Sequence, residues 1–103
     1  MMPTIEEALQ HLAIDYADDY ILGNVKRMLN AAIQTLYGSV GEDIEEYMPD
    51  DPRAKELVLI YLDDLYNERG LQNKVAASTR RMVSDMEWQL RLELRQLREA
   101  AQA

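Results

Sequence analysis

Apolar side chains recur along most of the chain at spacings of three and four residues, which is the period of an α-helix. The clearest stripe predicts a helix from about Asp18 to Tyr37, with Asp18 or Asp19 as its N-cap and Gly38 as a left-handed C-cap. One face of this helix should therefore lie in the core. The stripe consists of Ile21, Val25, Met28, Leu29, Ala32 and Leu36.

A short helix is predicted before this one. Thr4 and Glu7 have the spacing of a capping box, in which the hydroxyl and the carboxylate each satisfy an open backbone N–H group. Ile5, Leu9 and Leu12 then line one face of the predicted helix.

A third helix is predicted from about Pro52 to Arg69, with Gly70 as its end. Asp51 before Pro52 resembles an N-cap followed by proline at the first helical position. Residues 57–62 are apolar in succession, so this helix should be central or partly covered by a neighbouring subunit. A buried strand is the competing interpretation of this run, but the length of the surrounding pattern favours a helix.

The last helix is predicted over roughly 79–98, with residues 98–103 as a frayed tail. Ser84 and Glu87 form a second possible capping box, so the helix could begin as late as Asp85. Trp88 and Leu92 lie one turn apart and outside the apolar stripe. That stripe consists of Val83, Met86, Leu90, Leu94 and Leu97.

These patterns predict an all-α fold, a small bundle of about four helices in a single domain over residues 1–103. An acidic connector over 38–52 joins the second and third helices, and a second connector covers 70–78. In the acidic connector, Ile44, Tyr47 and Met48 could hold a short helical turn against the body.

The composition argues against an enzyme or a metal protein. The 103 residues include no cysteine and one histidine, which excludes disulfides, thiolate metal sites and sites with several histidines. Adjacent acids on a helix point about 100° apart and rarely share a substrate. We therefore expect no catalytic, cofactor-binding or metal-binding residues, and interpret His11 as structural or solvent-facing. The longest apolar run has six residues, and the N-terminus shows no export signal, so no membrane segment is expected.

The net charge of −8 is divided unevenly along the chain. Residues 1–68 carry four basic and fifteen acidic side chains, a net −11, whereas residues 69–103 carry seven basic and four acidic ones, a net +3. The overall sign argues against specific nucleic-acid binding. The division fits two alternatives, which are charge pairing within one monomer and a head-to-tail assembly of complementary surfaces.

The off-stripe pair in the last helix suggests a partner-binding face. Tryptophan and arginine are favoured interface anchors, and exposed apolar side chains on a surface helix need cover. The alternative is that the tryptophan packs on a neighbouring helix within the monomer. The interface candidates are Trp88, Leu92, Arg91, Arg95 and Arg98.

The chain resembles the head–tail connector, or adaptor, family of long-tailed phages, small helical proteins often described as possible DNA-packaging proteins. The third predicted helix is similar to a family helix that ends in a Tyr-x-x-Arg stretch, and a charged helix here continues past the usual family end to Glu99. The similar segments are residues 4–8, 11–15, 18–21, 57–62 and 65–69.

This resemblance implies a non-enzymatic virion protein without cofactors that assembles in the host cytoplasm. It would form a homo-oligomeric ring of roughly a dozen copies beneath the portal, bind the portal protein and a downstream neck or tail completion protein, and let DNA pass. An acidic inner wall would repel that DNA. The candidates for the wall are Glu42, Asp43, Glu45, Glu46, Asp50, Asp51, Asp63 and Asp64. The alternative is an acidic regulatory or DNA-mimic protein that occupies a basic site on a nucleic-acid enzyme.

Overall fold

The fold consists of α-helices. The structure, a computed structural model, describes residues 2–67 and 77–102. Over those ranges it contains no strand and five helices, four of which have seven or more residues, so the all-α prediction is confirmed. The strand interpretation of residues 57–62 is wrong, because the run lies inside a helix. The helices are α1 (Ile5–His11), α2 (Asp19–Ser39), α3 (Ile44–Tyr47), α4 (Pro52–Asn67) and α5 (Ala77–Gln102).

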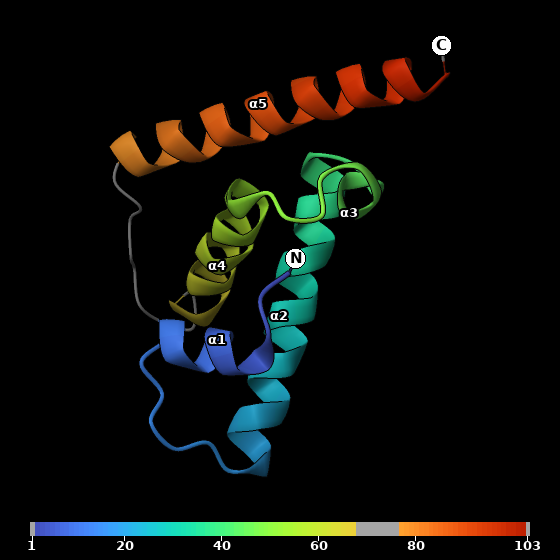
Figure 1. Ribbon diagram of the computed structural model, residues 1–103. Helices are drawn as coiled ribbons and strands as arrows, with labels where there is room; N and C mark the ends of the chain where they lie inside the picture. The colour runs from blue at the N-terminus through green and yellow to red at the C-terminus, as the bar shows by residue number, and fades with distance from the viewer. Residues whose placement is uncertain (1, 68–76, 103) are drawn as a thin grey trace.

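The antiparallel pair α2 and α4 forms the centre of the molecule and makes its most extensive helix contact (Figure 1). Helix α1 packs against both members of the pair near the start of α2. Helix α5 lies across the other end, where it contacts α3 and α4. The molecule is elongated, with a longest dimension of 50 Å. Helices α1 and α5 contact opposite ends of the central pair (Figure 1).

The predicted helix starts are confirmed by their capping contacts. The Glu7 N–H donates to Thr4 Oγ1 at 3.2 Å and the Thr4 N–H donates to Glu7 Oε1 at 3.1 Å, which completes the capping box of α1. At the start of α2, the Ile21 N–H donates to Asp18 Oδ1 at 2.8 Å. At the start of α4, the Arg53 N–H donates to Asp51 Oδ1 at 2.9 Å, as the aspartate–proline pair predicted.

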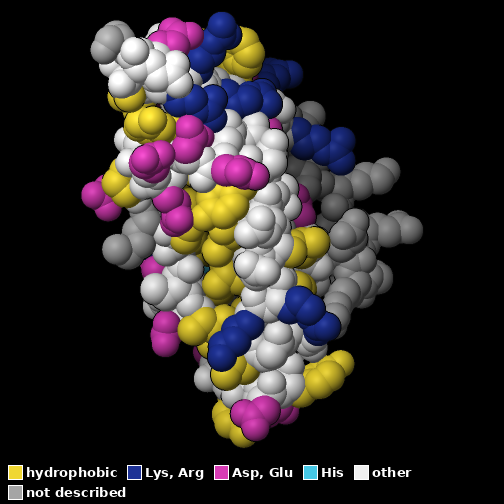
Figure 2. Space-filling view, turned by 90° about the vertical axis from the view of Figure 1, so that its right-hand side faces the viewer, with side chains coloured by type: hydrophobic (Ala, Val, Ile, Leu, Met, Phe, Trp, Pro, Cys, Tyr) yellow, Lys and Arg dark blue, Asp and Glu magenta, His cyan; other side chains and the backbone are white. Residues whose placement is uncertain are grey.

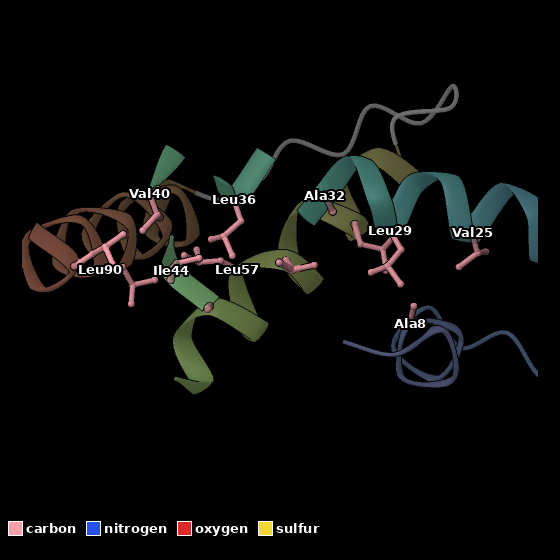
Figure 3. Packing of buried hydrophobic residues seen from close by; sticks show 13 residues of the cluster. Ala8, Val25, Leu29, Ala32, Leu36, Val40, Ile44, Leu57 and Leu90 are labelled. Atoms are coloured by element: carbon pink, nitrogen blue, oxygen red, sulfur yellow. The ribbon is translucent and has the colours of Figure 1, made fainter. Parts of the chain in front are cut away.

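One continuous core joins the two ends of the molecule (Figure 3). The predicted stripe of α2 is confirmed, with Val25, Leu29, Ala32 and Leu36 buried and facing α4 or α1. Within the apolar run of α4, the side chains of Leu57, Val58 and Leu62 are buried and those between them are half-buried. The core ends at Leu90 and Leu94 of α5.

Two predicted helix boundaries are wrong. Helix α2 continues through Gly38 to Ser39, and the residue in a positive-φ conformation is Gly41, at φ 151°. The chain there turns three residues later than expected, because Val40 has a helical backbone and is buried in the core. Ser84 does not begin a helix, since α5 begins at Ala77 and runs through it.

The remaining boundaries lie at the edge of the description. Helix α5 extends to Gln102, beyond the predicted end at residue 98. Helix α4 is described to Asn67, so the predicted stop at Gly70 lies outside the described residues, as do positions 70–76 of the second connector.

Helix α1 ends in a Schellman motif with an alanine in the left-handed position. Ala13 has φ 58°; its N–H donates to the Gln10 carbonyl at 3.1 Å, and the Ile14 N–H donates to the Leu9 carbonyl at 2.9 Å. These are the two hydrogen bonds of the motif, whose left-handed position usually holds glycine. The Cβ atom of Ala13 therefore strains the backbone, at a cost of about 1–2 kcal/mol for an L-residue in this region.

We expect Ala13→Gly to raise the free energy of unfolding by roughly 1 kcal/mol, since glycine adopts this conformation without steric strain. The measurement is urea denaturation followed by circular dichroism. Ala31→Gly is the matched control, because Ala31 is exposed inside α2, where the same change should lower stability by about 1 kcal/mol. A loss of stability in both variants would contradict the assignment of strain to Ala13.

Candidate partner-binding surface

The five interface residues predicted from the sequence line one open groove on α5, of about 280 Å³, whose sixth lining residue is Val40. We call it the α5 groove. Sequence reasoning missed Val40, which follows the last residue of α2 and lies beside α5 (Figure 3). The groove is lined by Val40, Trp88, Arg91, Leu92, Arg95 and Arg98.

The apolar part of the groove is open to solvent. The Trp88 side chain is 61% exposed and that of Leu92 is 44% exposed, one turn further along α5. Leu90 and Leu94, by contrast, are fully buried. Successive helical residues are about 100° apart, so a residue two positions from a buried leucine points to nearly the opposite side. The packing of α5 therefore turns the tryptophan outward, and the interpretation that it is covered within the monomer does not describe this structure.

Arg91 holds the tryptophan in a defined environment. Its guanidinium carbon lies 5.9 Å from the centre of the Trp88 ring, within the range of a cation–π contact. The same guanidinium donates from Nη1 to the carbonyl of Ser39 at 3.2 Å. Since Ser39 is the last residue of α2, this bond satisfies a carbonyl that the helix leaves open. The arginine thus connects the exposed indole to the end of another helix.

Arg98 closes one end of the groove by an ion pair within the chain. Its Nε donates to Asp43 Oδ2 at 2.6 Å and its Nη2 donates to Asp43 Oδ1 at 2.7 Å, which is a bidentate arrangement. These hydrogen bonds hold the pKa of Asp43 below its ordinary value and raise that of Arg98. Arg95 is more exposed, at 74%, and pairs with Glu99 along the same helix at 3.3 Å. Arg91 and Arg95 are therefore the more exposed arginines of the groove, and the charge of Arg95 is partly balanced by Glu99.

Gly41 allows the close approach of α5 at this point. A Cβ atom on this glycine would lie 2.5 Å from Arg98 Nη2 and 2.7 Å from Leu94 Cδ2. Both distances are far below van der Waals contact, and the positive φ of Gly41 disfavours other residues as well. The ion pair with Asp43 and the buried leucine thus both depend on a missing side chain.

A second ion pair fixes α5 to α4, and here the positive charge lies on α4 and the negative charge on α5. Arg53 lies between Asp51 and Glu93: its Nη1 and Nη2 donate to the Glu93 carboxylate at 2.6 and 3.0 Å, and its Nε and Nη2 donate to the Asp51 carboxylate at 3.0 and 2.7 Å. Hydrogen bonds from the guanidinium lower the pKa of both carboxyl groups. The Tyr61 hydroxyl of α4 also donates a hydrogen bond to Glu87 of α5. The pKa of Tyr61 is raised, mainly by burial of the side chain and to a lesser extent by this hydrogen bond.

The predicted acidic wall residues fall into two groups. Six of them lie between the end of α2 and the start of α4, where Figure 2 shows acidic side chains just below the arginines of α5. Asp63 and Asp64 lie near the other end of α4, on the order of 18 Å away along its axis. The structure therefore does not bring all eight candidates together. The first group is Glu42, Asp43, Glu45, Glu46, Asp50 and Asp51.

Several of these carboxylates have partners within the chain. Asp43 and Asp51 bind arginines, as described above. Glu45 Oε2 accepts a hydrogen bond from the Tyr37 hydroxyl at 2.9 Å. The pKa of Tyr37 is raised, mainly by burial of its side chain and to a lesser extent by this hydrogen bond. Asp63 Oδ2 lies 3.2 Å from His11 Nε2. This contact joins α1 to α4 and gives His11 a structural role. The side chains of Glu42, Glu46 and Asp50 are exposed to solvent.

We expect stability to fall as the pH drops below about 4.5, because Asp43, Asp51 and Glu93 have folded-state pKa values below their ordinary values of 3.8, 3.8 and 4.5. A depressed pKa stabilises the fold above the unfolded-state pKa, and this contribution is lost as pH falls through the folded-state value. Urea denaturation between pH 7 and pH 3 measures the loss.

The double variant Arg53→Met/Arg98→Met tests the cause. It should show a smaller loss between pH 5 and pH 3 than the wild type, since the carboxylates no longer have cationic partners. Arg80→Met/Arg81→Met removes two exposed arginines and should retain the wild-type dependence. Equal pH dependence in all three proteins would show that these ion pairs do not control acid stability.

Gly41→Ala should destabilise the protein by about 2 kcal/mol, through backbone strain and the clash with Leu94 and Arg98. Thermal and urea denaturation give the change. Gly23→Ala is the control: a Cβ there meets nothing within 4 Å, so replacing this mid-helix glycine should instead stabilise α2 by roughly 0.5–1 kcal/mol. Equal effects at the two glycines would contradict the close packing described at Gly41.

Residues 2–67 and 77–102, which the structure describes, hold neither a metal-binding cluster nor a membrane-spanning helix. No group of three or more His, Cys, Asp or Glu side chains there could hold a metal ion. Among the described helices, none combines the length and the apolar character needed to cross a bilayer. In comparisons with known proteins, no family, no curated protein and no solved structure matches this chain.

Proposed function

We propose that this protein is a structural subunit of a phage virion, a head–tail connector that forms a ring beneath the portal and binds it. The observation that carries the proposal is the α5 groove, in which Trp88 and Leu92 stay exposed beside Arg91 and Arg95. An exposed tryptophan flanked by arginines is typical of a binding surface, where such residues contribute most of the affinity. The resemblance of residues 4–8, 11–15, 18–21, 57–62 and 65–69 to the connector family supplies the kind of assembly.

The arrangement of the helices suits such a subunit. The four longer helices would form the bundle of the subunit body, and the outer face of α5 would remain available to a partner. A ring subunit needs surfaces for its neighbours at the sides, for the portal above and for the neck or tail below. Exposed surface at both ends of the elongated molecule offers room for these contacts.

The acidic wall of the proposed channel is best assigned to the segment around α3. Glu42, Glu46 and Asp50 are exposed there and would repel the phosphates of passing DNA. Asp43 and Asp51 belong to the same segment, but their charge is balanced by arginines and contributes less to this repulsion. Asp63 and Asp64 would face the channel at a different height.

Negative-stain electron microscopy of the purified protein at high concentration, with and without portal protein, tests the proposal. We expect annular particles, at least in the presence of the portal, which could act as a template. The proposal would be overturned if neither sample contained annular particles and the protein also failed to bind the portal in the sample that contains it. Tight binding to a nucleic-acid enzyme without particle association would instead establish the acidic regulatory or DNA-mimic function.

Trp88→Ala should weaken assembly without unfolding the monomer, because the side chain is largely exposed. A central interface tryptophan contributes about 2 kcal/mol or more, so we expect roughly thirtyfold weaker association. Sedimentation velocity gives the association constant, and circular dichroism monitors the helices. Met82→Ala is the matched control, since Met82 is 47% exposed on α5 but does not line the groove. Loss of helicity in the tryptophan variant would identify Trp88 as a core residue.

A further inference from the structure

The segment between α1 and α2, together with the first two residues of α2, forms a second exposed surface with aromatic side chains. Tyr16 is 78% exposed and Tyr20 is 75% exposed, which makes them the most exposed large hydrophobic side chains in the described part of the chain. Three acids, Asp15, Asp18 and Asp19, lie among them, and residues 15–20 contain no basic side chain. We call residues 15–20 the acidic tyrosine loop.

The ends of this loop are fixed to the body. On one side, the Schellman motif at Ala13 directs the chain out of α1. On the other side, Asp18 caps α2 and so fixes where that helix begins. Both tyrosines lie outside the core, although tyrosine readily buries its ring at interfaces. The loop is thus an anchored surface with two aromatic side chains and a negative charge.

The acidic tyrosine loop and the α5 groove are complementary in charge and in chemical type. The groove presents Arg91 and Arg95 around an exposed indole, and the loop presents carboxylates around exposed phenol rings. Aromatic rings stack on indole and on guanidinium groups, and carboxylates bind guanidinium groups through charge-assisted hydrogen bonds. The guanidinium groups of the groove could therefore bind the carboxylates of the loop, and the aromatic rings of the two surfaces could stack on each other.

The two surfaces cannot meet within one molecule. The loop lies at the end of the molecule where α2 begins, and α5 crosses the opposite end (Figure 1). The longest dimension of the fold is 50 Å. Figure 2 shows acidic and hydrophobic side chains at the tip opposite α5, with two basic groups just above them, and both basic and acidic side chains at the α5 end.

We propose that the α5 groove of one copy binds the acidic tyrosine loop of a second copy. This proposal rests on the proposed ring function and identifies the two surfaces that neighbouring subunits of the ring would join. The contact is heterologous, because it joins two different surfaces, so repetition produces a closed ring or an open filament. DNA is a poorer occupant of the groove. The chain has a net charge of −8, and the acids Glu87, Glu93 and Glu99 lie on the same helix as the arginines.

Disulfide cross-linking between two single-cysteine variants tests this contact. The chain has no cysteine of its own, so each introduced thiol is the only one present. A Tyr16→Cys protein and an affinity-tagged Leu92→Cys protein are mixed at equal concentration under mild oxidation, and the heterodimer is followed by mass. Gln34→Cys, at an exposed position on α2, replaces Leu92→Cys in the control mixture.

We expect the Tyr16–Leu92 heterodimer to form at least tenfold faster than the control heterodimer. Arg91→Glu/Arg95→Glu in the Leu92→Cys protein should reduce the rate to that of the control, by placing like charges opposite each other. Asp15→Arg/Asp19→Arg in the Tyr16→Cys protein should then restore the faster rate. Circular dichroism verifies that every variant is folded.

Rates equal to the control, or no restoration by the exchanged charges, would overturn the proposed contact. These failures are distinguishable from failure of the ring function. Annular particles without the cross-link would retain the ring and reject the loop, whereas absence of particles and of portal binding would reject the ring itself.

Discussion

The burial of two leucines on α5 determines the surface that the rest of the molecule presents. Leu90 and Leu94 are fully buried at the end of the core formed by α2, α3 and α4. Each such side chain contributes about 1.5–3 kcal/mol, more than the 0–1 kcal/mol of a typical exposed ion pair. Their positions fix the rotation of α5 about its own axis, and that rotation places Trp88 and Leu92 on the outer side. The exposed apolar surface is therefore a direct consequence of how the core is closed.

The polar contacts of α5 refine this arrangement and modify the simple picture of a basic segment on an acidic body. Arg98 binds Asp43 in the expected sense, but Glu93 binds Arg53 in the opposite sense. Pairing within the monomer thus uses charges of both signs and leaves Arg91 and Arg95 facing outward. The charge division in the sequence is consequently a poor guide to the pairs themselves. It is a better guide to what remains at the surface.

Much of the fold could be predicted from local patterns, because the caps and stripes of α1, α2 and α4 involve residues close together in the sequence. Ala13 could not be predicted as a left-handed residue, since alanine carries no signal for that conformation and its neighbours impose it. The turn at Gly41 in place of Gly38 has a similar origin, because the position of α5 decides where a side chain cannot fit. The off-stripe position of Trp88 and Leu92 and their flanking arginines on α5 identified five interface candidates that line the groove. Val40 was missed because it reaches the groove only through the tertiary fold.

The two ends of the molecule also constrain how copies of it can associate. In the proposed contact, a basic aromatic groove at one end and an acidic aromatic loop at the other would allow a repeated head-to-tail association. A repeated contact of this kind continues until the rotation between neighbours closes a ring. Each single contact involves few side chains, whereas a stable interface buries about 800 Å² on each partner. In the proposed ring, closure on a circular template would supply the cooperativity that one contact lacks, and would favour assembly at the site of use over assembly in dilute solution.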